Sequence, residues 1–134
     1  MIQALSIVAI LLSLGAGTSA DAPTARVKLV IDYGDGTQKV FAGLSWKEGM
    51  TVLDTLKSAQ RAPHGISFDH QGEGATAFVT QIDDLRNQGG GKEAKNWQYR
   101  VNGTFVKESS GTRGLQPGDE VLWIFDHFPP RAGH

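Results

Sequence analysis

Hydrophobic and polar positions alternate with period two at the start of the patterned part of the chain. In the segment "RVKLVIDY" at 26–33 this alternation predicts a strand. Its buried face would consist of Val27, Leu29, Ile31 and Tyr33. The Asp-Gly pair in "GDGT" at 34–37 is typical of a hairpin turn, because glycine readily accepts a positive φ. We therefore expect "QKVFAGLS" at 38–45 to return as a second, antiparallel strand.

The period then changes to that of a helix. Between residues 51 and 61 the apolar positions form one stripe, made of Val52, Leu53, Leu56 and Ala59. Thr51 followed by Asp54 resembles a capping box, and Pro63 marks the end of the segment. We expect a helix of roughly ten residues that is stable only when its single apolar face lies on a sheet.

The second half of the chain predicts further strands. The polar segment 64–75 is expected to be irregular, and "TAFVTQID" at 76–83 to be a third strand. "NWQYRV" at 96–101 and "TFVKE" at 104–108 flank Asn102-Gly103, which is a strong hairpin signal. The final run "VLWIF" is apolar on both faces, which is typical of a central strand.

This order of elements predicts an α+β fold. A mixed sheet of four to five strands with one helix packed across it would place the last strand in the middle, beside the first. That arrangement is the β-grasp, or ubiquitin-like, architecture. We assign the β-grasp domain to residues 26–126, preceded by a short linker at 21–25 and followed by a flexible tail at 127–134.

The first twenty residues differ from the rest of the chain in charge and hydropathy. Residues 1–20 contain no charged side chain, carry a short apolar run and end in small residues. We interpret them as a secretory signal peptide that is cut after Ala20, so that no membrane span remains after cleavage. An uncleaved anchor is the alternative. The protein is accordingly expected to be secreted or periplasmic.

Composition narrows the classes of function. The chain has 134 residues, a net charge of −1 and no cysteine. The balanced charge argues against a nucleic-acid-binding protein, which usually has an excess of basic residues. The absence of cysteine excludes disulfides, thiolate nucleophiles and thiolate-held metal sites. A domain of this size must therefore be held together by its core.

Four segments together resemble a known family. They are "GMTVLDTLKSAQ", "FVTQIDDL", "NWQYRVNG" and "LQPGDEVLWIF", and in this order they cover most of residues 26–125. The chain is in this respect similar to the β-grasp domain at the C-terminal end of transcobalamin and intrinsic factor, and to its stand-alone bacterial relatives. The resemblance implies a non-catalytic binding module with a cobalamin-like small molecule as a possible ligand, which meets the domain through loops and edges of the sheet.

Candidate catalytic and metal sites are poorly supported by the sequence. Asp69-His70 and Asp126-His127 are adjacent pairs, and neighbouring residues on a strand usually point to opposite faces. No metal-ligand spacing or nucleophile motif accompanies them. The pair Asp83-Asp84 is expected to lie at a strand end and a turn rather than to act in hydrolysis. We therefore expect no catalytic residue, no metal and no resident cofactor.

The hairpin and the glycine-rich loop before it form the predicted binding surface. Trp97 and Trp123 are expected to fill the core. The ligand-binding candidates, from the loop and hairpin, are Lys92, Trp97, Tyr99, Arg100, Asn102 and Phe105. The predicted partner is a small molecule, a glycan or a protein, and not a nucleic acid. The alternatives are a protein-protein adaptor of the cell envelope and an Asp/His hydrolase that would use His70, Asp83 and Asp84.

Overall fold

One mixed sheet of five strands forms the larger layer of the protein. A computed structural model describes residues 25 to 129. The strands of the sheet, in spatial order, are β3 (Gln38–Ser45), β2 (Arg26–Asp32), β9 (Glu120–Asp126), β7 (Asn96–Val101) and β8 (Thr104–Phe105). β9 runs parallel to β2, and the other neighbours are antiparallel. The predicted signal peptide, residues 21–24 of the linker and residues 130–134 of the tail lie outside the described residues.

The two hairpins and the central strand that the sequence predicts are confirmed. β2 and β3 pair antiparallel, as expected for a hairpin. Asn102 and Gly103 both have positive φ, of 51° and 84°, which is the conformation required between β7 and β8. β9 lies third of five, beside the first strand, and residues on both of its faces are buried, as the two-sided apolar run predicts. The α+β class with one helix and a mixed sheet is thus confirmed.

The helix α1 (Val52–Arg61) begins and ends where the pattern predicts. The backbone amide of Thr51 donates to Oδ2 of Asp54 at 2.9 Å, and the Asp54 amide donates to Oγ1 of Thr51 at 3.4 Å. This capping box satisfies amides that the first helical turn leaves without partners. Asp54 in the first turn and Arg61 in the last turn also complement the helix dipole.

A second, three-stranded sheet was not predicted. It consists of β4 (Phe68–Gln71), β5 (Phe78–Ile82) and β6 (Leu85–Arg86), with a short 3-10 helix at Gly74–Thr76. The expectation that 64–75 is irregular is therefore wrong, and the predicted strand at 76–83 pairs within this small sheet and not within the main one. The sequence signal was weak because β4 contributes a single buried apolar side chain, Phe68.

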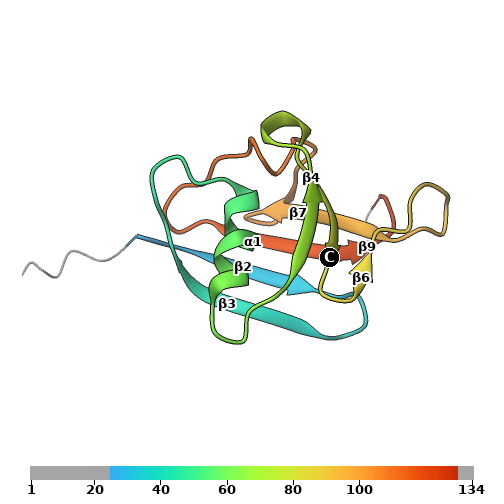
Figure 1. Cartoon of the computed structure of the whole chain (residues 1–134), viewed down its shortest axis with the longest axis horizontal. Coiled ribbons are helices and arrows are strands. Elements are labelled where there is room, and N and C mark those ends of the chain that lie inside the picture. The colour runs from blue at the N-terminus through green and yellow to red at the C-terminus, as the bar shows by residue number, and fades with distance from the viewer. Residues whose placement is uncertain (1–24, 130–134) are drawn as a thin grey trace, which may run out of the picture.

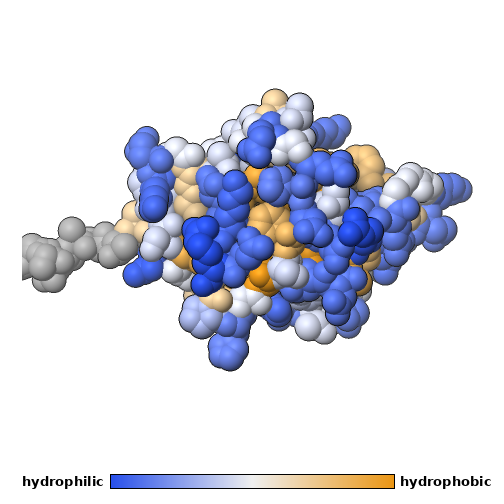
Figure 2. Space-filling model, in the orientation of Figure 1, coloured by the Kyte–Doolittle hydropathy of each residue, from blue (hydrophilic) through white to orange (hydrophobic). Residues whose placement is uncertain are grey.

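The helix and the small sheet lie together on one face of the main sheet (Figure 1). Polar side chains cover most of this face, and apolar atoms show mainly in a strip between α1 and β4 (Figure 2). Gly65 makes the entry to β4 possible, because a Cβ atom there would lie 2.1 Å from the carbonyl oxygen of Ala59. The described residues include no helix with the length and hydropathy needed to span a membrane.

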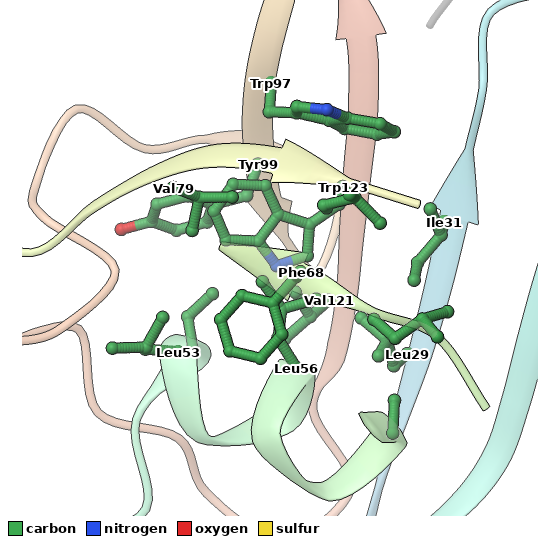
Figure 3. Packing of buried hydrophobic residues seen from close by; sticks show 14 of the residues in the cluster. Leu29, Ile31, Leu53, Leu56, Phe68, Val79, Trp97, Tyr99, Val121 and Trp123 are labelled. Carbon is green, nitrogen blue, oxygen red and sulfur yellow. The ribbon is translucent and has the colours of Figure 1, made fainter. Parts of the chain in front are cut away.

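The core fills the space between these two layers. Figure 3 shows Leu53 and Leu56 of α1, Phe68 of β4 and Val79 of β5 facing the side chains of the main sheet. The main sheet contributes Leu29, Ile31, Trp97, Tyr99, Val121 and Trp123, all of them buried. Trp97, Tyr99 and Val101 thus point inward from one side of β7, and the prediction that Trp97 and Trp123 belong to the core is confirmed.

We predict that Leu56→Ala lowers the free energy of unfolding by about 2 to 5 kcal/mol. Leu56 is fully buried, and its truncation leaves a cavity that the surrounding side chains cannot fill completely. Urea unfolding followed by circular dichroism measures the change, with Gln60→Ala on the exposed face of the same helix as the control. Equal stability of the two variants would contradict the packing of α1 on the sheet.

Candidate functional site

The two sheets meet along a line where β5 lies beside β7 without pairing with it. β8 pairs only with Arg100 and Val101 of β7, so in the described part of the chain no strand pairs with Asn96–Tyr99 on the side away from β9. Side chains bridge the two edges instead. Nδ2 of Asn87 donates to the carbonyl of Val79 on β5 at 2.8 Å, and its Oδ1 accepts from the amide of Trp97 on β7 at 2.8 Å.

A surface groove follows this line, and we call it the seam groove. It consists of two adjoining hollows of about 340 Å³ and about 420 Å³. Phe78, Gln98 and Phe128 line both hollows and so mark the middle of the groove. Asn87 lies at one end, and Ser109, whose Oγ donates to the carbonyl of Ala77 at 2.8 Å, lies at the other.

The rims of the seam groove carry exposed aromatic rings. Phe78 is 56% exposed and Phe128 is 60% exposed, which places them among the few large apolar side chains that the described structure leaves in solvent. Phe105 supports Phe128, with 5.6 Å between the two ring centroids. Exposed apolar side chains gathered at a concave surface are typical of a binding site.

Hydrogen bonds and ring contacts fix the buried aromatic side chains that form the floor of the hollow of about 340 Å³. The hydroxyl of Tyr99 donates to the carbonyl of Glu108 at 2.5 Å, and Nε1 of Trp97 donates to the carbonyl of Leu85 at 2.8 Å. Tyr99 and Trp123 pack with ring centroids 5.2 Å apart. Burial and then the charge of Glu108 raise the pKa of Tyr99 to about 12, so its phenol is neutral at physiological pH.

Gln98 lines both hollows, and its side chain holds a buried polar atom that has no hydrogen-bond partner among the described residues. Its Nε2 donates to the carbonyls of Asp126 at 2.9 Å and His127 at 2.7 Å, which fixes the orientation of the side-chain amide. Oε1 therefore points away from both carbonyls. It is buried and has no hydrogen-bond partner among the described residues, as is also true of Nε1 of Trp123. Buried polar atoms without partners are uncommon and costly.

Three of the six predicted ligand-binding residues come together here, and three do not. Trp97, Tyr99 and Phe105 line the seam groove, the first two as part of its floor. Arg100 pairs with Phe105 across the hairpin, is buried, and lines neither hollow. Lys92 is exposed in the loop before β7.

Both polar atoms of the Asn102 side chain make hydrogen bonds within the protein. Its Nδ2 donates to Oδ1 of Asp119 at 2.9 Å, and its Oδ1 accepts from the amide of Glu120 at 2.9 Å. These bonds fix the tip of the hairpin to the start of β9. A role in binding for any of the six residues stays a prediction.

Sequence reasoning missed the residues that line both hollows, namely Phe78, Gln98 and Phe128. A signal was present for Phe78, because Ala77 and Val79 are buried and the alternation places Phe78 on the outer side of β5. An aromatic ring on the polar side of a strand is a recognisable sign of a binding surface. Gln98 and Phe128 gave no such signal, since their proximity arises only when β7 and the residues after β9 come together.

A second polar cluster joins the two sheets at the opposite end of β5. Asp83, in the turn after β5, accepts hydrogen bonds from the hydroxyl of Tyr33 at 2.5 Å, from Nζ of Lys39 at 3.3 Å and from the amide of Ser67 at 3.0 Å. We call these three contacts the Asp83 latch. Its position at the strand end agrees with the sequence-based expectation, and the left-handed φ of 50° makes it a turn residue.

The latch determines the protonation of both partners. Burial raises the pKa of Asp83, but the hydrogen bonds from Tyr33, Ser67 and Lys39, together with the charge of Lys39, outweigh it and leave the pKa below its ordinary value of 3.8. Burial, the hydrogen bond to Asp83 and the negative charge of Asp83 raise the pKa of Tyr33. Asp83 is thus a carboxylate and Tyr33 a neutral phenol over the physiological range.

The residues proposed for a hydrolase are not assembled around Asp83. The ring of His70 stacks on Phe68 with centroids 5.7 Å apart, and it is absent from the hollow of about 530 Å³ that Asp83 and Asp84 line. The expectation that adjacent Asp and His residues point apart is wrong for one pair, because Oδ1 of Asp126 lies 3.4 Å from Nδ1 of His127. Residues 25–129 contain no group of three His, Asp or Glu side chains arranged to hold a metal ion.

Comparison with known proteins gives a family and a fold. Residues 49–127 match the model of the family described as a domain of unknown function (DUF4430). Curated proteins provide no match to the chain.

Among solved structures, a proposed metal binding protein from Ruminococcus gnavus ATCC 29149 is similar, with a TM-score of 0.59 and 17% identity; the match covers 77% of this chain and 97% of that one. Haptocorrin in complex with Cbi has a TM-score of 0.67 and 12% identity, and the match covers 84% of this chain but 27% of haptocorrin. At these identities the likeness shows the fold alone.

We predict that Asp83→Asn removes an acid-sensitive part of the stability. Because the pKa of Asp83 is lower in the folded than in the unfolded protein, its contribution is present above pH 3.8 and is lost as the pH falls through the folded-state pKa. The variant should therefore be less stable than the wild type at pH 7, and the difference should shrink toward pH 2. Urea unfolding between pH 2 and pH 7 measures it.

Asp84→Asn is the matched control, since Asp84 is exposed and follows Asp83 directly. It should unfold like the wild type at each pH. A difference between Asp83→Asn and the wild type that is the same at every pH would show that the Asp83 carboxylate does not carry the effect.

Proposed function

We propose that this chain, which belongs to the DUF4430 family of unknown function, is a non-catalytic module of the β-grasp type that binds a small molecule in the seam groove. The observation that carries the proposal is the groove itself. Exposed Phe78 and Phe128 line both of its hollows, and the buried rings of Trp97, Tyr99 and Trp123 line one of them. Hollows of several hundred Å³ that are mainly apolar with a few polar groups are typical of small-molecule sites.

The β-grasp assignment is supported by the arrangement of elements. One helix crosses a mixed sheet in which the last strand lies in the centre, parallel to the first. Haptocorrin has a similar fold over 84% of this chain. Since that structure contains Cbi, a corrinoid such as cobalamin is a reasonable first compound to test.

The groove favours a ligand-binding module over the two alternatives. A protein-protein adaptor would be better supported by a flat apolar patch, whereas Phe78 and Phe128 border a concave surface. A hydrolase would require the carboxylates of Asp83 and Asp84 to act with a base. Asp83 is instead bonded to Tyr33, Lys39 and Ser67, which leaves it little freedom to act on a substrate.

Secretion is part of the proposal, and its test is separate from that of binding. The apolar, uncharged character of residues 1–20 supports export with removal of a signal peptide after Ala20. N-terminal sequencing of the protein recovered outside the cytoplasm should then begin at Asp21. Recovery of the chain with its first twenty residues intact in the membrane fraction would support the anchor instead.

Binding is tested by a thermal-shift screen of the protein with corrinoids, glycans and small aromatic compounds. A ligand present at about one hundred times its Kd should add roughly 2.7 kcal/mol of stability. Phe78→Ser should remove most of that shift, because it removes one wall of the groove.

Val40→Ser is the matched control, since Val40 is 54% exposed and lies on β3, away from the groove. The triple variant at Lys92, Arg100 and Asn102 tests the loop surface predicted from sequence. If that variant loses binding and Phe78→Ser retains it, the ligand lies at the hairpin tip and not in the seam groove.

A further inference from the structure

We propose that the guanidinium of Arg100 binds the carboxylate of an aromatic ligand on the outer face of the main sheet, which is the face turned away from α1 and the small sheet (Figure 1). This inference adds a second site to the proposed function and does not depend on it, because Arg100 lines neither hollow of the seam groove. It follows from the position of Arg100, from its burial without a counter-ion and from the side chains around it.

The alternation of side chains along β7 places Arg100 on the outer face. Tyr99 and Val101, its neighbours in sequence, are buried in the core between the two layers. Successive side chains of a strand point to opposite faces, so Arg100 points away from that core. Across the main sheet it lies opposite Leu122 on β9 and opposite Phe105 on β8. Its side chain therefore emerges between two apolar ones.

Apolar side chains on the outer face account for the burial of Arg100. Val30 and Ile124 are both buried, yet neither belongs to the core between the two layers. Val30 on β2 lies opposite Leu122, so Val30, Leu122 and Arg100 form one row across the sheet. The aliphatic part of an arginine side chain packs well on such a surface, while its charged end stays in contact with water.

The charge of Arg100 has no counter-ion in the described part of the chain. Arg100 is 9% exposed, and none of the hydrogen bonds and ion pairs of the described residues involves its guanidinium. Its nitrogen atoms do not belong to the buried side-chain atoms that lack a partner, so they reach solvent. A largely buried arginine usually has a partner of opposite charge, and within residues 25–129 Arg100 has none.

The acidic side chains nearest to Arg100 in the register leave it free to bind an external anion. Glu120 lies on the outer face of β9, is exposed, and makes no ion pair with Arg100. Asp119, the preceding residue, accepts a hydrogen bond from Nδ2 of Asn102 at 2.9 Å. An anionic ligand can therefore approach the guanidinium without displacing an existing partner.

Aromatic rings next to Arg100 favour a ligand that has a ring of its own. Phe105 lies directly opposite Arg100, and the ring of Phe128 packs on Phe105 with centroids 5.6 Å apart. Phe128 is 60% exposed, so this pair presents aromatic surface to solvent. A guanidinium binds a carboxylate through two parallel hydrogen bonds, and a ring attached to that carboxylate can contact the phenylalanines.

The charge balance favours a carboxylate over a phosphate. A carboxylate carries one negative charge, which one guanidinium compensates. A phosphate monoester carries about 1.5 to 2 negative charges at neutral pH, and Glu120 on the same face would repel the excess.

The experiment compares benzoate with benzamide, which has the same ring and a similar shape but no charge. Each compound is titrated into the isotope-labelled protein at low ionic strength, and the dissociation constant is taken from the shifts of the Nε–H group of Arg100 and of the amides of β7 and β8. The wild type should bind benzoate about tenfold more tightly or better, because only benzoate forms a charge-assisted pair. Added salt should weaken the binding of benzoate and not that of benzamide. Phenyl phosphate should bind less tightly than benzoate.

Three variants locate the effect. Arg100→Met keeps an unbranched apolar stem without the charge, and should bind benzoate no more tightly than benzamide. Arg100→Lys keeps the charge without the planar fork, and should bind benzoate more weakly than the wild type does. Arg61→Met is the matched control, since it removes an exposed arginine at the end of α1, and it should change nothing. The comparison of the compounds in the wild type does not depend on the folding of any variant.

The outcomes separate this inference from the proposed function. Equal affinity of the wild type for benzoate and benzamide, or no binding of benzoate, would overturn the site at Arg100. Equal losses in Arg100→Met and Arg61→Met would show that net charge alone attracts the anion, and would overturn it as well. Tighter binding of phenyl phosphate would overturn the choice of a carboxylate. Phe78→Ser should leave the binding of benzoate unchanged, and a loss in that variant would place benzoate in the seam groove and overturn the outer site.

Discussion

The side chain of Asn87 sets the distance between the two sheets, and the groove depends on that distance. Its amide accepts from the backbone of Trp97 and donates to the backbone of Val79, so it stands where a direct strand-to-strand hydrogen bond would otherwise form. Directly paired strands lie roughly 4.8 Å apart. An amide inserted between β5 and β7 leaves more room than direct pairing, and it gives the carbonyl of Val79 and the amide of Trp97 hydrogen-bond partners at a gap where they would otherwise lack them.

The core keeps that gap from closing. The large rings of Trp97, Tyr99 and Trp123, from β7 and β9, fill the space under the small sheet. Trp97 and Tyr99 donate hydrogen bonds to backbone carbonyls, and Trp123 packs against Tyr99. Protein interiors are closely packed, so β5 cannot move toward β7 without displacing these rings. The Asp83 latch holds the far end of β5 to the main sheet through Tyr33 and Lys39. The small sheet is therefore fixed at both ends, and the groove between them is preformed.

Much of the fold could be predicted from sequence, and the reasons are local. The capping box at Thr51, the turn at Asn102-Gly103 and the two-faced apolar run of β9 each determine their own conformation through nearby residues. The small sheet could not be predicted in the same way. β4 has one buried apolar residue, Phe68, and its conformation depends on pairing with β5 and on the close approach at Gly65. In the seam groove, the positions of Trp97, Tyr99 and Phe105 on the hairpin follow from a visible strand pattern, whereas Gln98 and Phe128 become neighbours only through the tertiary fold.

The position of the groove residues in the sequence indicates whether other members of the family could form the same groove. The segment that matches the family model, residues 49–127, contains β5, β7 and β9, and thus Phe78, Gln98 and the whole aromatic floor. Phe128 follows the segment directly. Tyr33, directly after β2, and Lys39, on β3, belong to the Asp83 latch and lie before the matched segment. The residues that line the seam groove therefore come almost entirely from the matched segment, whereas the latch also uses residues from β3 and from the turn after β2. Because a likeness of fold does not assign function, it is this division of the chain, rather than the similarity to haptocorrin, that makes the groove the site to examine in the rest of the family.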